Sequence, residues 1–93
     1  MAESLTLEDL GIGIGKLVFF DMGGTHGNIG MITEIFNSSE GIRSVRIMHP
    51  TGRIRVRSLD YDIEHGSLFA VPDVDAEVLI KGCKAWQDFL ASR

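Results

Sequence analysis

Cysteine, proline and long apolar stretches are scarce in this chain of 93 residues, which has one cysteine and two prolines. The lone Cys83 excludes an internal disulfide, and no second cysteine stands at metal-ligand spacing. No apolar run approaches the roughly 20 residues that cross a membrane, and the first residues lack the positive start and apolar core of a signal peptide. We therefore expect a cytoplasmic protein that packing alone holds together.

The composition is that of an ordinary globular protein, with 44% hydrophobic and 24% charged residues and no biased tract. A length of 93 residues is close to the lower size at which one domain can bury a core of its own. We therefore expect a single domain over residues 1–93, and a two-domain enzyme is excluded.

The net charge of −4 is unevenly distributed along the chain. Residues 1–41 contain six acidic residues and one lysine, and residues 58–93 contain seven acidic and three basic residues. Between them, residues 42–57 contain five arginines and no acidic residue. This pattern disfavours indiscriminate binding to polyanions but allows one local positive patch.

Apolar runs predict five short strands. A β-prone run covers residues 17–20, and a Gly-rich loop over residues 22–28 separates it from a second strand at 29–36. The clearest pattern is a hairpin, in which runs at 42–48 and 53–57 flank a short turn, residues 49–52, that ends in Gly52. A helical or 3₁₀ connector over residues 58–66 then precedes a short strand at 68–71 that Pro72 ends.

Two helical pieces flank these strands. Thr6 and Asp9 have the spacing that caps a short helical turn over residues 4–10. Apolar residues recur at helical spacing over residues 76–91, with Gly82 as the weak point. The expected fold class is mainly β: a small five-stranded SH3-like or Greek-key barrel over residues 16–73, with the short N-terminal helical turn and a C-terminal amphipathic α-helix over residues 75–92.

Lys16-Leu17-Val18 leads into the Gly-rich loop, and Gly30 stands where a hydrophobic strand leaves that loop. In this arrangement the chain resembles the KOW-type SH3-like barrel, in which a glycine follows the first loop. Residues 16–73 are also similar to short SH3-like proteins encoded by bacteriophages, in which a hairpin ending in a Gly-Arg/Lys-Ile segment leads into a Ser-Leu-Asp connector, here Ser58-Leu59-Asp60. The resemblance implies a module that binds RNA, ribosomal or transcription partners, or other proteins, and it implies a structural role for Gly30.

Arginines alternate with branched residues along the second strand of the hairpin. Arg53, Arg55 and Arg57 are separated by Ile54 and Val56, so on a strand all three guanidinium groups project from one face. The branched side chains are then expected to enter the core.

Arg46 on the preceding strand would extend this Arg face across the hairpin, which gives four cations suited to phosphate or carboxylate groups. Three interpretations stay open. The face binds nucleic acid or an acidic protein; or Asp60, Asp62, Glu64 or the acidic N-terminus folds over it and neutralises it; or the face is the solvated exterior of a strand. No aromatic residue lies between positions 37 and 60 to stack on bases.

The C-terminal helix offers a second candidate binding surface, an apolar stripe made of Leu79, Trp86, Phe89 and Leu90. If the helix packs on its own barrel, this stripe is part of the core. If the helix projects, the stripe is a dimerisation or partner-docking element.

No motif indicates catalysis. The Asp21-Met22-Gly23-Gly24-Thr25 stretch looks like the phosphate-binding turn of sugar kinases, but such kinases need two domains. The three histidines lack metal-ligand spacing, and no nucleophile and base are paired by spacing. We expect no metal, cofactor or small-molecule substrate.

The sequence therefore predicts a non-catalytic interaction module, a protein–protein adaptor or assembly component whose partner is another protein or a second copy. The alternative is a nucleic-acid-binding module that uses the Arg face.

Overall fold

The computed structural model describes residues 6–22 and 25–93, and within them all side chains except those of Met22 and residues 25–27. In this part of the chain the elements follow in the order β1 (Leu17–Met22), β2 (Thr25–Asn37), β3 (Arg43–Met48), β4 (Ile54–Ser58), α1 (Leu59–Glu64), β5 (Leu68–Ala70), α2 (Asp73–Lys81) and α3 (Lys84–Ala91). The expected mainly β fold class is confirmed.

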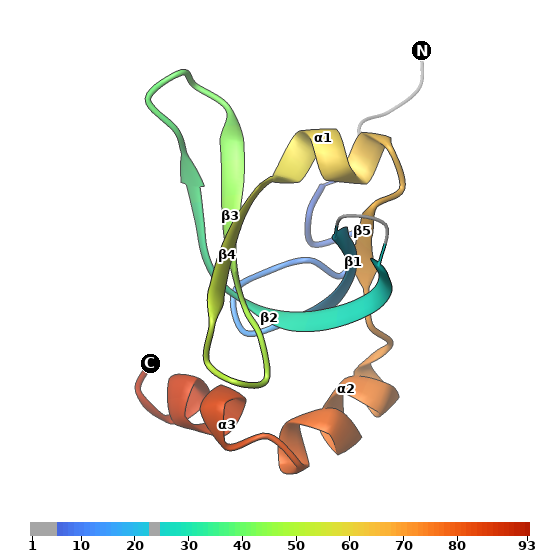
Figure 1. The fold of residues 1–93 in the computed structure, drawn as a ribbon, viewed down its shortest axis with the longest axis vertical. Coiled ribbons are helices and arrows are strands. Elements are labelled where there is room, and N and C mark those ends of the chain that lie inside the picture. The colour runs from blue at the N-terminus through green and yellow to red at the C-terminus, as the bar shows by residue number, and fades with distance from the viewer. Residues whose placement is uncertain (1–5, 23–24) are drawn as a thin grey trace.

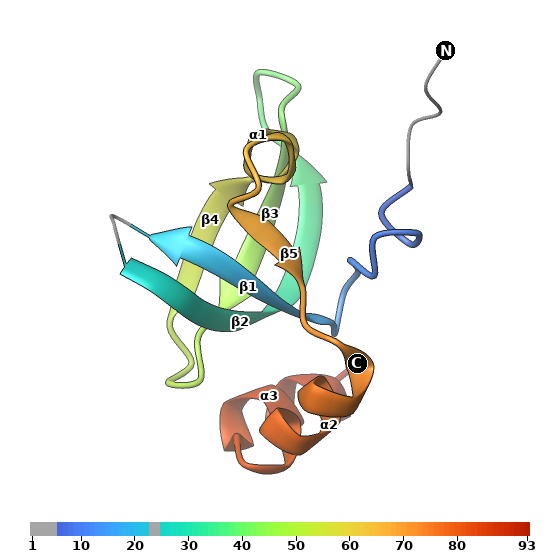
Figure 2. The same ribbon diagram turned by 90° about the vertical axis from the view of Figure 1, so that its right-hand side faces the viewer.

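The five strands form one antiparallel sheet in the order β4-β3-β2-β1-β5. The sheet is strongly curved, and the long strand β2 runs through its middle (Figures 1 and 2). Within the described residues, β4 and β5 each pair with a single neighbour, so the sheet stays open between its two edges. Five antiparallel strands are therefore confirmed, whereas closure into a barrel is not.

Most of the expected elements occur close to their predicted positions. The hairpin is β3–β4, and in its turn the His49 N–H donates to Arg53 O at 2.7 Å. The helical connector is α1. The loop after β1 is shorter than expected because β2 begins at Thr25. A backbone ladder needs no apolar side chains, so it continues through residues whose polarity predicts a loop.

The sheet has apolar side chains packed on both faces near β1. We call the inner face the side on which Val18 and Phe20 pack, and the outer face the side on which Leu17 packs, because side chains alternate across a strand. The inner cluster also contains Ile12, Ile32, Val45, Ile47, Leu59 and Leu68, and the outer cluster contains Met31, Val71, Cys83 and Trp86. This burial on both faces agrees with the continuous apolar run in residues 17–20 of β1.

The C-terminal segment forms two helices, so the prediction of one helix over residues 75–92 is wrong. α2 ends at Lys81, Cys83 has an extended backbone with φ −130° and ψ 106°, and α3 begins at Lys84. The two helices lie at one end of the sheet, beside the turn of the β3–β4 hairpin (Figures 1 and 2). None of the helices in the described ranges is long and apolar enough to cross a membrane.

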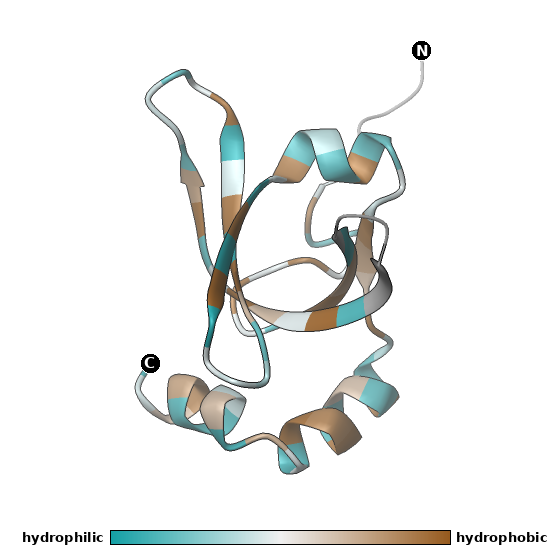
Figure 3. Cartoon of the chain, in the orientation of Figure 1, coloured by the Kyte–Doolittle hydropathy of each residue, from teal (hydrophilic) through white to brown (hydrophobic). Residues whose placement is uncertain are grey.

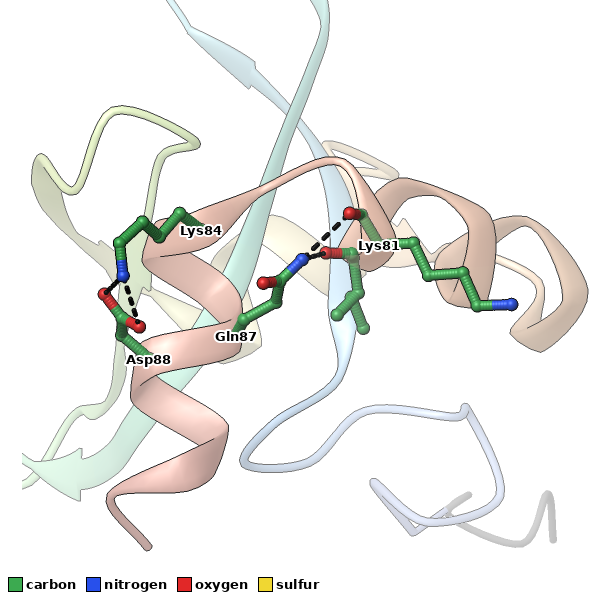
Figure 4. Close-up of polar contacts among 5 residues, drawn as sticks. Lys81, Lys84, Gln87 and Asp88 are labelled. Atoms are coloured by element: carbon green, nitrogen blue, oxygen red, sulfur yellow. Dashed lines mark hydrogen bonds and ion pairs between the residues drawn. The ribbon is translucent and has the colours of Figure 1, made fainter.

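A side chain of α3 caps the end of α2. The amide of Gln87 donates to the carbonyl oxygens of Ile80 and Lys81 at 2.8 and 2.9 Å (Figure 4). Carbonyls in the last turn of a helix have no partner within the helix. Ile80 O also accepts from the Cys83 N–H at 3.0 Å, so the Gln87 amide adds a second bond there and caps Lys81 O.

The N-terminal turn is present over the described residues 6–10, whereas the expected residues 4 and 5 lie outside them. The Thr6 N–H donates to Asp9 Oδ2 and the Asp9 N–H donates to Thr6 Oγ1, both at 3.1 Å. The backbone bond from Thr6, followed by its side-chain bond, lowers the pKa of Asp9 below the usual 3.8. The turn is a single one and does not continue as a helix.

Candidate interaction surface

Strand β4 carries its arginines and its apolar residues on opposite faces of the sheet. Arg55 lies opposite the buried Ile47, so Arg55 and the alternate arginines on either side of it are on the inner face. Ile54 and Val56 are on the outer face and are 41% and 56% exposed. The expectation that these branched side chains enter the core is therefore wrong. Figure 3 shows the alternation of hydrophilic and hydrophobic residues along this strand.

Arg46 does not join the other arginines. It lies opposite Val56 on the outer face, and its Nε donates to Glu34 Oε1 at 2.7 Å. Its guanidinium group also lies 5.0 Å from the centroid of the Phe36 ring. The four arginines predicted to form one face are therefore divided between the two faces of the sheet.

Acidic residues of α1 neutralise part of the Arg-rich region. Arg57 Nη2 donates to Asp62 Oδ1 at 3.2 Å, its Nε donates to Asp62 Oδ2, and the Asp62 residue is only 3% exposed. The same guanidinium lies 5.8 Å from the centroid of Phe20. On a neighbouring strand, Arg43 Nε donates to Asp60 Oδ1 at 3.1 Å. Arg57 is therefore a structural residue that joins β4 to α1.

The side chains of Arg53 and Arg55 remain exposed and form no ion pair or hydrogen bond within the described part of the chain. Beside them, the His49 ring packs edge-on against Phe20 at 5.5 Å between centroids. Burial lowers the pKa of His49 below the usual 6.5, and the positive charges of Arg55 and then Arg53 lower it further. His49 was not among the predicted site residues, since a turn sequence does not indicate where the ring points.

The free edge of β4 also carries unpaired backbone groups. The bond from the His49 N–H to Arg53 O marks a hydrogen-bonded pair, and such pairs recur at every second position of an antiparallel ladder. The N–H and C=O groups of Ile54 and Val56 therefore point away from β3. They form no hydrogen bond to the described residues. We call residues 53–56, with this outward backbone, the β4 edge.

The predicted helix stripe does not form one free surface. Leu79 lies on α2 and is 37% exposed, whereas Trp86 lies on α3 and is 2% exposed. Trp86 Nε1 donates to Met48 O at 2.9 Å. Phe89 and Leu90 are half-buried against the same outer cluster. The α3 part of the stripe therefore packs on the chain's own sheet and holds the β3–β4 hairpin.

Gly30 and Gly52 meet different structural requirements. Gly30 lies where β2 passes close to β3, and a Cβ there would overlap Ile47 Cγ2 and lie 3.0 Å from Met48 O. Gly52 has open space around it, but its φ of +93° is in the left-handed region that favours glycine. Packing therefore requires Gly30, and the hairpin turn requires Gly52.

A groove of about 400 Å³ lies between α2 and the start of β1. On its rim, Lys16 pairs with Asp73 at 3.8 Å and Lys81 pairs with Glu77 at 3.6 Å. Because each lysine on the rim is paired with a carboxylate, the groove does not select for a ligand of either charge. Within residues 6–22 and 25–93, no three His, Cys, Asp or Glu side chains gather at metal-binding spacing.

No protein-family model, curated protein or solved structure matches this chain. Its function is therefore inferred from the geometry of its surfaces.

Proposed function

We propose that this protein is a non-catalytic interaction module that binds an extended segment of a partner protein along the β4 edge. An incoming strand would bond to the outward N–H and C=O groups of Ile54 and Val56 and extend the sheet. The exposed side chains of the same two residues would pack against alternate side chains of the partner. The outward backbone of β4, which has no partner strand among residues 6–22 and 25–93, is the observation that carries this proposal.

Contacts of α3 and of Cys83, the residue before it, support a docking surface that exists before the partner arrives. Trp86 Nε1 donates to Met48 O, and Cys83 Sγ donates to Pro50 O at 3.5 Å. Both contacts fix the hairpin that ends at the β4 edge. A surface fixed in this way loses little conformational entropy on binding, which favours affinity.

We also propose that the module is SH3-like and located in the cytoplasm. Three features support an SH3-like barrel that is open between β4 and β5: the five-stranded sheet, the position of α1 before β5 and the glycine required at position 30. The buried free thiol of Cys83 is compatible with a reducing cytoplasmic compartment.

The substitution Val56→Pro tests binding at this edge. Proline removes the outward N–H and leaves the ladder with β3 intact, whereas the control Val56→Thr keeps the N–H and a β-branched side chain. We expect peptides selected from a random library to shift backbone amide resonances mainly along β4, and Val56→Pro to weaken their binding by about tenfold or more. Val56→Thr should retain that binding.

Two results would contradict the proposal: selected peptides that shift mainly resonances of the groove beside α2, or peptides that bind the proline variant as tightly as the original protein. Thermal unfolding of both variants verifies that the sheet still forms.

Nucleic-acid binding is the second candidate function, and it is favoured by the exposed side chains of Arg53 and Arg55, which have no partner among the described residues. Phosphate contacts would survive Val56→Pro, because both guanidinium groups remain, but not the double substitution Arg53→Ala with Arg55→Ala. Binding of a labelled oligonucleotide that weakens steeply with salt and shows this pattern would replace the protein-binding proposal.

A further inference from the structure

The chemistry of the β4 edge restricts which strand can pair with it. The edge has an Arg-bearing inner side, with Arg53 and Arg55 exposed and unpaired within the described residues. It has an apolar outer side, with Ile54 and Val56 at 41% and 56% exposure. The side chains of a bound strand also point alternately to the inner and the outer side, so they must complement the arginines on one side and the apolar residues on the other.

A second copy of this chain does not satisfy the inner side. Two copies joined edge to edge by a two-fold axis pair β4 antiparallel, and the outward groups of Ile54 and Val56 must form the hydrogen-bonded pairs. In each such register an arginine lies directly opposite an arginine. When residue 54 of one copy pairs with residue 56 of the other, Arg55 lies opposite Arg55 of the other copy. When residue 54 pairs with residue 54 of the other copy, Arg53 lies opposite Arg55. Like charges directly opposite each other destabilise a strand pair.

The charge that acts on the edge is positive. Residues 42–57 contain five arginines and no acidic residue, and acidic side chains from α1 and β2 pair with three of the five. The remaining two, Arg53 and Arg55, lie on the inner side of the edge beside His49, and their positive charges add to the effect of burial in lowering the pKa of His49. A carboxylate on an added strand would lie opposite these two guanidinium groups, which accept carboxylates with two parallel hydrogen bonds.

We propose that the β4 edge binds an extended acidic protein segment in which Asp or Glu alternates with apolar, β-branched residues. This inference rests on the proposed function and specifies the partner. The carboxylates lie on the inner side opposite Arg53 and Arg55, and the apolar residues lie on the outer side beside Ile54 and Val56. The strand backbone provides the common hydrogen bonds.

Labelled synthetic peptides test the partner's chemistry by fluorescence anisotropy with the full chain. The test peptide alternates glutamate with valine and threonine. One control peptide replaces glutamate by lysine, and a second keeps the composition but groups the glutamates at one end. We expect the alternating glutamate peptide to bind about tenfold more tightly than either control, because only it places carboxylates opposite both arginines.

Charge reversal at Arg55 is the matched variant. Arg55 is exposed and unpaired in the described residues, so Arg55→Glu should fold normally, as thermal unfolding will verify. We expect this variant to lose binding of the glutamate peptide by about tenfold and to gain affinity for the lysine peptide. Val56→Pro should weaken binding of both peptides, since it removes the backbone contact that they share.

The other outcomes separate this inference from the proposed function. If the glutamate and lysine peptides bind equally and Val56→Pro weakens both, strand addition stands and the acidic preference is wrong. If the grouped peptide or a single-stranded oligonucleotide binds as tightly as the alternating peptide, the edge recognises polyanions and the inference is overturned. If the synthetic peptides fail but library peptides still map to β4, only the inference fails.

Discussion

A methyl group at Gly30 would overlap Ile47 Cγ2 on the neighbouring strand and lie 3.0 Å from Met48 O. We therefore expect Gly30→Ala to lower the free energy of unfolding by about 1–3 kcal/mol, the usual cost of overpacking. Urea denaturation followed by the fluorescence of Trp86, the single tryptophan, measures this loss.

Gly82→Ala is the control for this prediction. Gly82 has φ −95°, which alanine adopts, and a methyl group there would meet only Leu79 O at 3.7 Å. This variant should unfold near the same urea concentration as the original chain. A similar loss of stability in both variants would contradict the packing explanation for Gly30.

At the same scale, the arginines of β4 show what spacing alone predicts. Period-two alternation places Arg53, Arg55 and Arg57 on one face, as the structure has them. The same alternation does not determine which face packs against the core. Ile54 and Val56 were therefore predicted to enter the core, whereas they lie exposed on the outer face. Arg46 was joined to the others wrongly because the length of the hairpin turn decides which residues of the two strands share a face.

Among the elements, the junction of α2 and α3 is capped by the side-chain amide of Gln87, in addition to the backbone bonds that Gly82 and Cys83 donate. Gln87 Nε2 donates to Ile80 O and Lys81 O, and Gln87→Glu keeps the length of the side chain but replaces the donor by a carboxylate near a helix C-terminus. We expect this substitution to lower the free energy of unfolding by about 1–2 kcal/mol in the same urea assay.

The exposed pair of Lys84 and Asp88 on α3, also shown in Figure 4, provides the control for the Gln87 variant. An exposed pair at this spacing contributes only a few tenths of a kcal/mol, so Lys84→Ala should change the stability by less than about 0.5 kcal/mol. If Lys84→Ala costs as much as Gln87→Glu, the loss is a general effect on α3 rather than the loss of the cap.

The helix break itself could be predicted only in part. Apolar residues continue at helical spacing through Gly82, so the pattern predicts one helix with a weak point. The structure ends α2 there because Cys83 and Trp86 both reach the outer face of the sheet, and the extended backbone at Cys83 permits this. The position of the sheet relative to a helix depends on long-range contacts, which the spacing of nearby residues does not predict.

For the whole molecule, the continuous apolar run of β1 correctly predicted a buried strand, since the chain packs apolar side chains on both faces of the sheet there. Closure of the sheet was not predictable in this way. It depends on the distance between the β4 and β5 edges after the sheet has curved, and no local pattern records that distance. The candidate site shares this limit, because it is the opening of the sheet that leaves the β4 edge without a partner strand among the described residues.

The stability of the whole molecule should depend on pH through His49. Burial, together with Arg55 and Arg53, lowers the pKa of His49 below 6.5 in the folded state. Its buried Nε2 has no hydrogen-bond partner among the described residues. The protonated ring would need two hydrogen-bond acceptors, one for each N–H group. As the pH falls below 6.5, the unfolded chain binds a proton at this residue before the folded chain does, so the free energy of unfolding decreases. The loss is complete once the pH is below the folded-state pKa.

Urea denaturation between about pH 7.5 and about pH 5.5 measures this dependence above the range in which carboxylates titrate. His49→Gln should flatten the dependence, whereas His65→Gln at the exposed end of α1 should leave it in place.

Arg53→Ala with Arg55→Ala should raise the pKa of His49 toward 6.5, measured by the titration of its ring resonance. The double substitution should reduce the pH dependence of stability without abolishing it, because burial remains. An acidic strand bound at the β4 edge should raise the same pKa, since its carboxylates offset the field of both arginines. A pKa of His49 that neither change moves would show that the arginines do not act on the inner side of the edge.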